Sequence, residues 1–249
     1  MAARIALVTG AGSGIGRAVA KALVGEGWDT ILIGRRIEKL EETAAQAGGP
    51  GRAVPIACDV TNSEQIDIVF SRIEREFGRL DLLFNNAGVA AKGAPIDEIP
   101  VETWRHVVDV NLTGAFLCAR AAFGLMRRQM PMGGRIINNG SISAHAPRPG
   151  SAPYTTTKHA ITGLTKTLAL DGRPFDIACG QIDIGNALTE MAAPMTIGVP
   201  QADGHIAPEA TMDVGHVADA VLHMSRLPLD VNILFMTVMA TKMPFVGRG

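Results

Sequence analysis

Short apolar runs alternate along the chain with longer stretches in which apolar residues recur every three or four positions. The short runs are typical of buried strands, and the longer stretches are typical of amphipathic helices. Strands and helices that alternate in this way form βαβ units, so we expect an α/β fold of the doubly wound Rossmann type, with a parallel sheet and helices on both faces. Seven strands are predicted, at Arg4–Thr9, Thr30–Gly34, Ala53–Cys58, Leu80–Asn85, Gly134–Ser141, Ile177–Ile184 and Asn232–Ala240.

Helical periodicity is clearest after the first and third predicted strands. Apolar positions three and four residues apart run from Ile15 to Leu23 and from Ile66 to Ile73. Thr61, followed by Glu64, predicts a capping box at the start of the second of these helices. Two longer helices are expected, at about Val101–Gln129 and Tyr154–Leu170.

Nothing in the 249 residues divides the chain, because it contains neither a low-complexity linker nor a repeat of roughly 20 to 50 residues. We expect one Rossmann-fold domain over residues 1–249. The segment Leu188–Met212 differs in composition, since it carries Pro194, Pro200 and Pro208 among glycine and alanine. We expect a mobile loop or two short helices there, covering the substrate site.

The charge balance argues against polyanionic partners. The chain has 23 Lys and Arg against 24 Asp and Glu, a formal net charge of −1, and 47% hydrophobic residues. Such a chain has no general attraction to nucleic acid or anionic lipid, and no run reaches the roughly 18 apolar residues of a membrane span. We expect a cytoplasmic protein with a small-molecule substrate and with no nucleic-acid or membrane partner.

Cysteine and histidine spacing predicts neither a disulfide framework nor a metal site. The three cysteines lie about 60 residues apart, and the six histidines lack ligand spacing. Free thiols fit a reducing compartment. Three methionines near the C-terminus are expected to be core or subunit contacts: Met236, Met239 and Met243.

Glycines are concentrated between the first strand and the first helix. Gly10, Gly14 and Gly16 form a G-x-x-x-G-x-G pattern there, at the place where a dinucleotide-binding turn belongs. Backbone N–H groups and the helix N-terminus would face a pyrophosphate, and we expect Ser13 and Ile15 to contribute to the same contact. A glycine-rich corner without a ligand is the alternative.

Two arginines follow the second strand, where an NAD-binding chain usually carries Asp or Glu for the ribose 2′-hydroxyl. Arg35 and Arg36 suit a 2′-phosphate, which guanidinium groups bind through charge-assisted hydrogen bonds. We therefore predict NADP(H) in preference to NAD(H). The alternative is that both arginines are solvated charges at the start of a loop.

Two later strand ends are candidates for the adenosine part of the cofactor. Asp59 and Val60 follow the third strand and are expected to meet the adenine edge. Asn86, Ala87 and Gly88 follow the fourth strand and are expected to line the adenosine ribose. Each segment by itself is a weak signal.

The only tyrosine, Tyr154, precedes Lys158 by four residues in a predicted helix, so both side chains lie on one helix face. Ser141 ends the fifth strand thirteen residues earlier. Phenols ionise at about pH 10, and a lysine cation about 4 Å away stabilises a phenolate by roughly 4 kcal/mol at an effective dielectric of about 20. That is enough for general acid/base catalysis near neutral pH, with Ser141 stabilising the developing oxyanion. The alternative is a tyrosine packed on a loop and a solvated lysine.

With these segments the chain resembles the short-chain dehydrogenase/reductase family over essentially its whole length. The resemblance implies reversible hydride transfer between a nicotinamide cofactor and an alcohol or carbonyl carbon. It implies Tyr154 as general acid/base, Ser141 as donor to the substrate oxygen, and Lys158 as partner of the tyrosine and anchor of the ribose. It also implies that Asn111 holds a proton-relay water, and it suggests a homotetramer or homodimer built through the two long helices. The matching segments are Thr9–Gly16, Asn85–Gly88, Asp109–Gly114, Ser141 and Tyr154–Lys158.

The chain departs from the family after the sixth strand, where Ile184-Gly185 replaces the usual Pro-Gly. Gly185 and Thr189 still fit the family's contact with the nicotinamide carboxamide, so we expect Ile184, Gly185 and Thr189 to contact the cofactor. Asp183 is interpreted as a turn cap in preference to a buried strand-end carboxylate. Arg148 is interpreted as a solvated loop residue in preference to one that faces the substrate.

The leading hypothesis is an NADP(H)-dependent oxidoreductase that interconverts a small secondary alcohol and its ketone. The alternatives are an NAD(H)-dependent dehydrogenase of the same family and a dinucleotide-sensing binding protein without catalysis. The residues expected to line the substrate pocket are Ser143, Ala144, His145, Met191 and Met195.

Overall fold

Seven parallel strands form one sheet in the computed structural model, which describes residues 3–246. Their order is β3-β2-β1-β4-β5-β6-β9, so the direction in which strands are added reverses between β1 and β4. Doubly wound sheets bind ligands at such a reversal. The predicted α/β fold and all seven predicted strands are confirmed. The strands are β1 (Arg4–Thr9), β2 (Trp28–Gly34), β3 (Ala53–Ala57), β4 (Leu82–Asn85), β5 (Gly134–Asn139), β6 (Ile177–Ile184) and β9 (Phe235–Val238).

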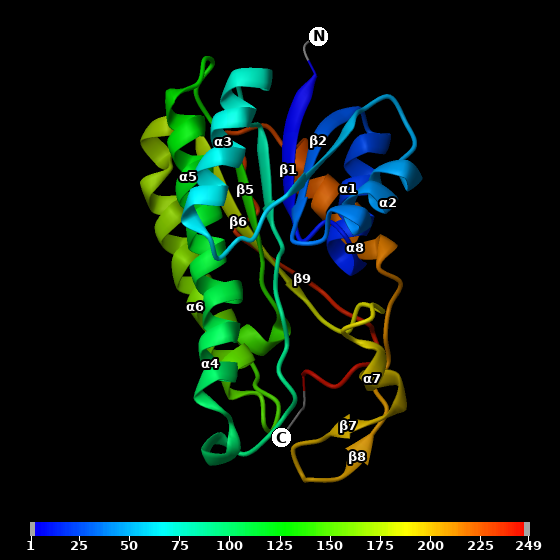
Figure 1. Cartoon of the computed structure of the whole chain (residues 1–249). Helices are drawn as coiled ribbons and strands as arrows, with labels where there is room; N and C mark the ends of the chain where they lie inside the picture. Colours follow the sequence, from blue (N-terminus) through cyan, green and yellow to red (C-terminus); the bar gives the residue numbers. More distant parts are fainter. Residues whose placement is uncertain (1–2, 247–249) are drawn as a thin grey trace.

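Helices cover both faces of the sheet (Figure 1). The first face carries α1 (Gly14–Gly25), α2 (Ile37–Gln46) and α8 (Gly215–Arg226). The second face carries α3 (Ser63–Phe77), α5 (Gly114–Arg128) and α6 (Ala152–Asp171). Three single-turn 3₁₀ helices lie in the described loops, at η1 (Ile96–Glu98), η3 (Ile142–Ala144) and η4 (Arg173–Phe175).

The residues of β1 show why an uninterrupted apolar run becomes a strand here. Ile5 and Leu7 belong to the hydrophobic core beneath α3 and α5, whereas Ala6 and Val8 belong to the core beneath α1 and α8. Successive strand side chains point to opposite faces, so a run that is apolar at every position fits a sheet covered on both sides. All four residues are at most 4% exposed.

The predicted helix Val101–Gln129 is a continuous helical run that contains a π turn. α4 (Val101–Val108), the π turn (Asp109–Thr113) and α5 follow one another without a break. By length and hydropathy this run could cross a membrane, contrary to expectation, and 44% of its most apolar window is buried. α5 packs against α3 and β4, so much of its apolar character serves the protein core.

The start of α3 differs by one residue from the predicted capping box. Asn62 is the N-cap, and its Oδ1 accepts a hydrogen bond from Gln65 N at 3.0 Å. The Thr61 hydroxyl instead donates to Asp59 Oδ1 at 2.9 Å. Asn caps a helix at least as well as Thr, and Asp59 offers the threonine a local acceptor, so the cap moves to the next residue.

The segment 188–212, expected as a mobile loop or two short helices, contains one short helix and a small hairpin. The helix is α7 (Ala193–Ile197), and the antiparallel hairpin pairs β7 (Val199–Pro200) with β8 (Ile206–Ala207). In Figure 1 the segment lies at the lower right, beyond the carboxyl ends of the strands and opposite α4. It therefore stands beside the carboxyl edge of the sheet, where doubly wound folds bind their ligands.

The chain after β9 turns back onto the same edge. Met243 belongs to a small hydrophobic cluster around Ile142, against which Met239 and Phe245 pack. Met236 packs against the sheet core. The expected core role of these methionines is confirmed, and the described residues after β9 pack against Ile142 in the loop that follows β5.

Candidate active site

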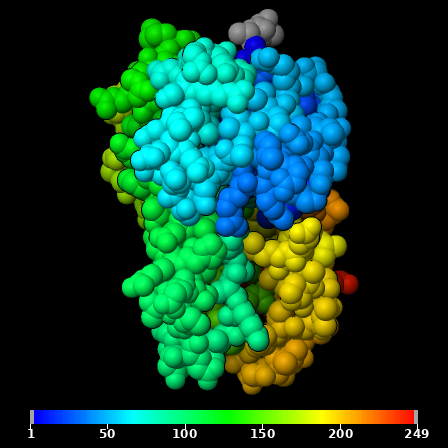
Figure 2. Space-filling view, viewed as in Figure 1, coloured from blue at the N-terminus to red at the C-terminus, as the bar shows by residue number. Residues whose placement is uncertain are grey.

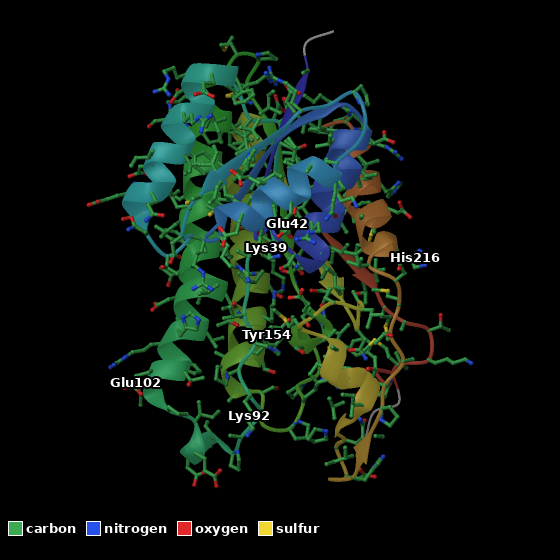
Figure 3. The ribbon with its side chains drawn as sticks, turned by 45° about the vertical axis from the view of Figure 1, so that its right-hand side comes forward. Lys39, Glu42, Lys92, Glu102, Tyr154 and His216 are labelled. Carbon is green, nitrogen blue, oxygen red and sulfur yellow. The ribbon has the colours of Figure 1, made fainter. Side chains whose placement is uncertain are left out.

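The predicted site residues come from separate elements and gather at the carboxyl edge of the sheet. β1, β4, β5 and β6 end at this edge, and α6 begins beside it. Figure 3 shows Tyr154 on the side of α6 that faces the centre of the molecule. Figure 2 shows a hollow in the adjoining surface, between the green and the yellow-to-orange parts of the chain.

Tyr154 and Lys158 lie one turn apart at the start of α6. Lys158 is only 6% exposed, and its Nζ lies 5.5 Å from the centre of the Tyr154 ring. The ammonium donates to the carbonyl oxygen of Asn139, the last residue of β5, at 2.7 Å. A buried charged group is costly unless it is hydrogen bonded. The Asn139 carbonyl therefore fixes the cation beside the phenol.

Ser141 follows β5 and caps η3. Its backbone N–H donates to Asp183 Oδ1 at 3.0 Å, and its Oγ accepts from Ser143 N at 3.1 Å. A serine hydroxyl has one hydrogen to donate and two lone pairs. Because Ser143 engages a lone pair, the hydrogen of the Ser141 hydroxyl remains available to a further acceptor.

Asn111 lies in the π turn and is 3% exposed. Its Oδ1 accepts from Val89 N at 2.8 Å, and its Nδ2 donates to Val89 O at 2.9 Å and to Thr157 Oγ1 at 3.4 Å. Gly88 lies next to this amide. The side chain thus joins the loop after β4 to the π turn and α6, and π turns are frequent at functional sites. The relay water assigned to Asn111 stays a prediction.

The glycine turn has backbone geometry that glycine adopts readily. Gly10 has a φ of +66° and Gly14 a φ of +49°, both in the left-handed region. A Cβ at Gly16 would overlap the Gly10 carbonyl oxygen. Ser13 is the N-cap of α1, and Ile15 lies in its first turn. This backbone fits a pyrophosphate, which must approach N–H groups at a helix N-terminus closely.

Thr9 ties the loop after β4 to the glycine turn. Its Oγ1 accepts from Asn86 N at 2.8 Å and from Ala87 N at 2.7 Å, and its carbonyl accepts from Asn86 Nδ2 at 2.8 Å. Asn139 Nδ2 donates to Asn86 Oδ1 at 2.8 Å. A line of hydrogen bonds therefore runs from the glycine turn to Asn139, the residue that holds Lys158.

The segment after β2 presents a group of cations. Arg35 and Arg36 are exposed, and neither guanidinium makes a hydrogen bond or ion pair with any other described residue. Lys39 on α2 packs over Gly12 and pairs with Glu42 at 2.7 Å (Figure 3). Guanidinium groups without protein partners suit an anionic ligand.

Asp59 and Val60 have structural partners of their own. Asp59 Oδ1 accepts from the backbone N–H of Thr61 at 3.0 Å and from its hydroxyl at 2.9 Å. Val60 is buried and packs against Gly114 at the start of α5. Their expected contact with adenine stays a prediction.

Gly185 lies against residues that follow β9: a Cβ there would come within 2.5 Å of the Met243 sulfur and 2.9 Å of the Met239 Cβ, so these side chains would have to shift. Ile184, which stands in place of the family's proline, ends β6 and is 8% exposed. The methyl group of Thr189 lies next to Gly14. The segment 188–212 therefore begins beside the glycine turn.

Asp183 is a buried strand carboxylate, so its interpretation as a turn cap is wrong. It lies within β6 and is 0% exposed. Its Oδ1 accepts from Ser141 N at 3.0 Å and from Gln181 Nε2 at 2.7 Å. Buried carboxylates require such donors, and Ser141 is brought to Asp183 only because β5 pairs with β6.

The interpretation of Arg148 as a solvated residue is also wrong. Its guanidinium forms a bidentate ion pair with Glu209, with both N–O distances 2.6 Å, and donates to Asn186 Oδ1 at 3.0 Å. The Arg148 side chain is 15% exposed and that of Glu209 2%. Burial alone raises the pKa of Glu209, but hydrogen bonds from Arg148 and Asn186 outweigh it and hold the pKa below its usual value. The pair ties the loop before α6 to the segment 188–212.

A protein-family model described as short chain dehydrogenase matches residues 4–198. The chain belongs to the short-chain dehydrogenase/reductase family. The matched part of this family member contains the glycine turn, the π turn, Ser141 and the pair Tyr154 and Lys158. The match ends before the hairpin, so the hairpin, α8 and the C-terminal residues lie outside it.

Individual short-chain dehydrogenases/reductases resemble the chain over most of its length. It is 38% identical over 182 residues to a 3beta-hydroxysteroid dehydrogenase of Mediterraneibacter gnavus, covering 72% of this chain and 64% of the relative. It is 40% identical over 170 residues to dehydrogenase/reductase SDR family member 11 of Gallus gallus, covering 66% of each. The chain thus spans just under two thirds of both relatives. A solved structure of an actinorhodin polyketide ketoreductase variant with NADPH has a TM-score of 0.85 at 27% identity, covering 96% of this chain and 98% of that one.

Sequence reasoning missed the residues that hold the family's site residues in place. Asn139 holds Lys158, which is 19 residues away, and Asp183 holds Ser141, which is 42 residues away. Glu209 holds Arg148 across 61 residues. No motif marks these partners, because their roles depend on which strands and loops become neighbours. Lys39 could have been recognised from the sequence as a further cation of the segment after β2, since it follows Arg35 and Arg36 closely.

Proposed function

We propose that this short-chain dehydrogenase/reductase is an NADP(H)-dependent oxidoreductase that interconverts a small secondary alcohol and its ketone. The observation that carries the proposal is the buried Lys158 ammonium, 5.5 Å from the centre of the Tyr154 ring and hydrogen bonded to Asn139. A cation beside a phenol stabilises the phenolate more than the neutral form. This is the property that a tyrosine needs to act as general acid/base.

In the reduction direction, the Tyr154 hydroxyl donates its proton to the ketone oxygen as negative charge develops there. The Ser141 hydroxyl donates a hydrogen bond to the same oxygen. Lys158 stabilises the phenolate that remains, and in the oxidation direction that phenolate accepts the alcohol proton. The nicotinamide, when bound, supplies or accepts the hydride.

The residues present fit a nicotinamide dinucleotide phosphate. Gly10 and Gly14 have left-handed backbone and Gly16 has no room for a Cβ, so the turn suits the close approach of a pyrophosphate to the N-terminus of α1. Arg35 and Arg36 would bind the 2′-phosphate. The NADPH in the related ketoreductase structure supports the same class of cofactor. The further proposed contacts are Gly10, Ser13, Gly14, Ile15, Gly16, Asp59, Val60, Asn86, Ala87, Gly88, Tyr154, Lys158, Ile184, Gly185 and Thr189.

The proposal includes a cytoplasmic homotetramer or homodimer assembled through the long helices. Trp104 on α4 is 39% exposed and Phe116 on α5 is 48% exposed. Large apolar side chains on one exposed helical run support a subunit contact. Asn111 completes the proposed catalytic set, as the residue at the relay water.

A panel of ketones and hydroxy compounds, assayed with NADPH and NADH by nicotinamide fluorescence, tests this function. We expect at least one small ketone to oxidise NADPH, with kcat/KM about tenfold or more above that with NADH. Faster turnover with NADH would indicate an NAD(H)-dependent dehydrogenase. NADPH binding without turnover of any carbonyl would indicate a dinucleotide-sensing protein.

A further inference from the structure

His145 follows Ser141 by four residues and shares its carboxylate partner. His145 Nε2 lies 2.8 Å from Asp183 Oδ2, while Oδ1 of the same carboxylate accepts from Ser141 N at 3.0 Å. One buried carboxylate at the end of β6 therefore positions both residues. The imidazole is placed beside the serine that would bind the reacting oxygen.

The donors around Asp183 determine which ring nitrogen of His145 carries the hydrogen. Asp183 Oδ1 accepts from two N–H groups, those of Ser141 and Gln181. A carboxylate has no hydrogen to donate, so in the contact between His145 Nε2 and Asp183 Oδ2 the imidazole nitrogen is the donor. Nδ1 makes no hydrogen bond with another residue in the described part of the chain, and the side chain is 45% exposed. A neutral imidazole in this tautomer offers Nδ1 to a ligand as an acceptor.

Other residues are adapted to this arrangement. A Cβ at Gly140 would overlap Asp183 Oδ1, so position 140 must be glycine while the carboxylate is in place. The requirement arises from space alone, since the φ of Gly140 is not in the left-handed region. Phe245 packs against the imidazole in an edge-to-face contact, with ring centroids 6.4 Å apart. The ring is thus fixed by a carboxylate at one edge and by an aromatic neighbour.

We propose that His145 is a specificity-determining residue that accepts a hydrogen bond from a hydroxyl group on the carbon next to the reacting carbonyl. The inference rests on the proposed ketone reduction at Tyr154, and it narrows the substrate class to hydroxyketones and the corresponding diols. Ser141 binds the carbonyl oxygen, and His145, on the same carboxylate, binds the neighbouring hydroxyl. That hydroxyl is bound and does not react.

Two ketones with the same carbon skeleton test the inference: 1-hydroxybutan-2-one and butan-2-one. With NADPH, we expect kcat/KM for the hydroxyketone to exceed that for butan-2-one about tenfold, the effect of one hydrogen bond. His145→Phe should reduce this preference to within about threefold, mainly through a higher KM for the hydroxyketone. His145→Asn, whose amide oxygen can replace Nδ1 as acceptor, should retain it. His216→Phe, at an exposed position on α8, is the control and should change neither value.

The same preference in the parent and in His145→Phe would overturn the inference. An equal loss for both ketones would also overturn it, because it would show a structural role only. A preference for pyruvate over both ketones that is lost in His145→Phe would also overturn the inference. The imidazole would then donate a hydrogen bond to the pyruvate carboxylate, whereas the inference requires it to accept one. If His145→Phe does not fold, His145→Ala gives the same comparison. Reduction of butan-2-one without a preference for the hydroxyketone would contradict the inference alone, whereas no reduction of any carbonyl would contradict the proposed function as well.

Discussion

The Lys158 ammonium donates to the Asn139 carbonyl oxygen at 2.7 Å, at the end of β5. The Asn139 side chain donates in turn to Asn86, which is hydrogen bonded to Thr9 beside the glycine turn. The proposed proton donor and the proposed dinucleotide site are therefore positioned by one hydrogen-bonded network. Lys158 and the glycine turn lie at opposite ends of this network. A substitution at Lys158 and a substitution in the proposed cofactor site therefore test separate roles.

Lys158→Met removes the charge while keeping most of the volume. We expect kcat/KM to fall about 100-fold and the alkaline limb of the pH–rate profile to move to higher pH, since the phenolate loses its stabilising cation. Lys166→Met, at an exposed position on the same helix, is the matched control and should leave both unchanged. An unmoved alkaline limb would contradict the electrostatic role of Lys158.

Arg35→Asp combined with Arg36→Ala tests the cofactor preference. We expect the Kd for NADPH to rise about 100-fold while the Kd for NADH changes less than threefold, because only the 2′-phosphate loses its partners. Isothermal titration calorimetry measures both constants, and Arg72→Ala on the exposed side of α3 is the control. Unchanged NADPH binding in the double variant would show that the arginines are solvated charges.

The fold and the local part of the site could be predicted from the sequence, because both are indicated by patterns among residues that are close together along the chain. β1 and β6 have the predicted bounds, and Tyr154 and Lys158 share one helix because of their spacing. The burial of Asp183 and the pairing of Arg148 could not be predicted, since they depend on contacts made only after the sheet and the segment 188–212 assemble. The hairpin in that segment was also missed, because strands of two residues are too short to show a period.

Arg148→Met should destabilise the protein by about 3 kcal/mol, because it leaves the buried Glu209 carboxylate without its cation. Urea unfolding monitored by circular dichroism measures the loss. Lys39→Met breaks an ion pair in which both side chains are more than one third exposed, and it should cost less than about 1 kcal/mol. Equal effects of the two substitutions would contradict a stabilising role for the Arg148–Glu209 ion pair, which joins the loop before α6 to the segment 188–212.

The lowered pKa of Glu209 also predicts a pH dependence of stability. A carboxyl whose pKa is lower in the folded than in the unfolded state stabilises the fold above its ordinary value of 4.5, and this contribution is lost as the pH falls through the folded value. The melting temperature of the parent should therefore fall more steeply below pH 4.5 than that of Glu209→Gln. Parallel curves for the two proteins would show that Glu209 does not contribute.

The three cysteines should resist alkylation in the folded protein. Burial, with a smaller contribution from the Asp59 charge, raises the pKa of Cys58 to about 11, and burial raises the pKa of Cys179 to about 12. Burial also raises the pKa of Cys118. At pH 8, iodoacetamide should label them about 100-fold more slowly than a free thiol, and mass spectrometry after unfolding should show all three labelled. Rapid labelling of any one in the native protein would contradict its burial.

Steady-state kinetics of Tyr154→Phe, with NADPH and the best ketone of the panel, decide whether the Tyr154 hydroxyl delivers the proton. We expect kcat/KM to fall at least about 100-fold, because the proton donor is lost, while the Kd for NADPH stays within about threefold, because the hydroxyl is only one of many proposed cofactor contacts. Turnover within tenfold of the parent would show that another group delivers the proton.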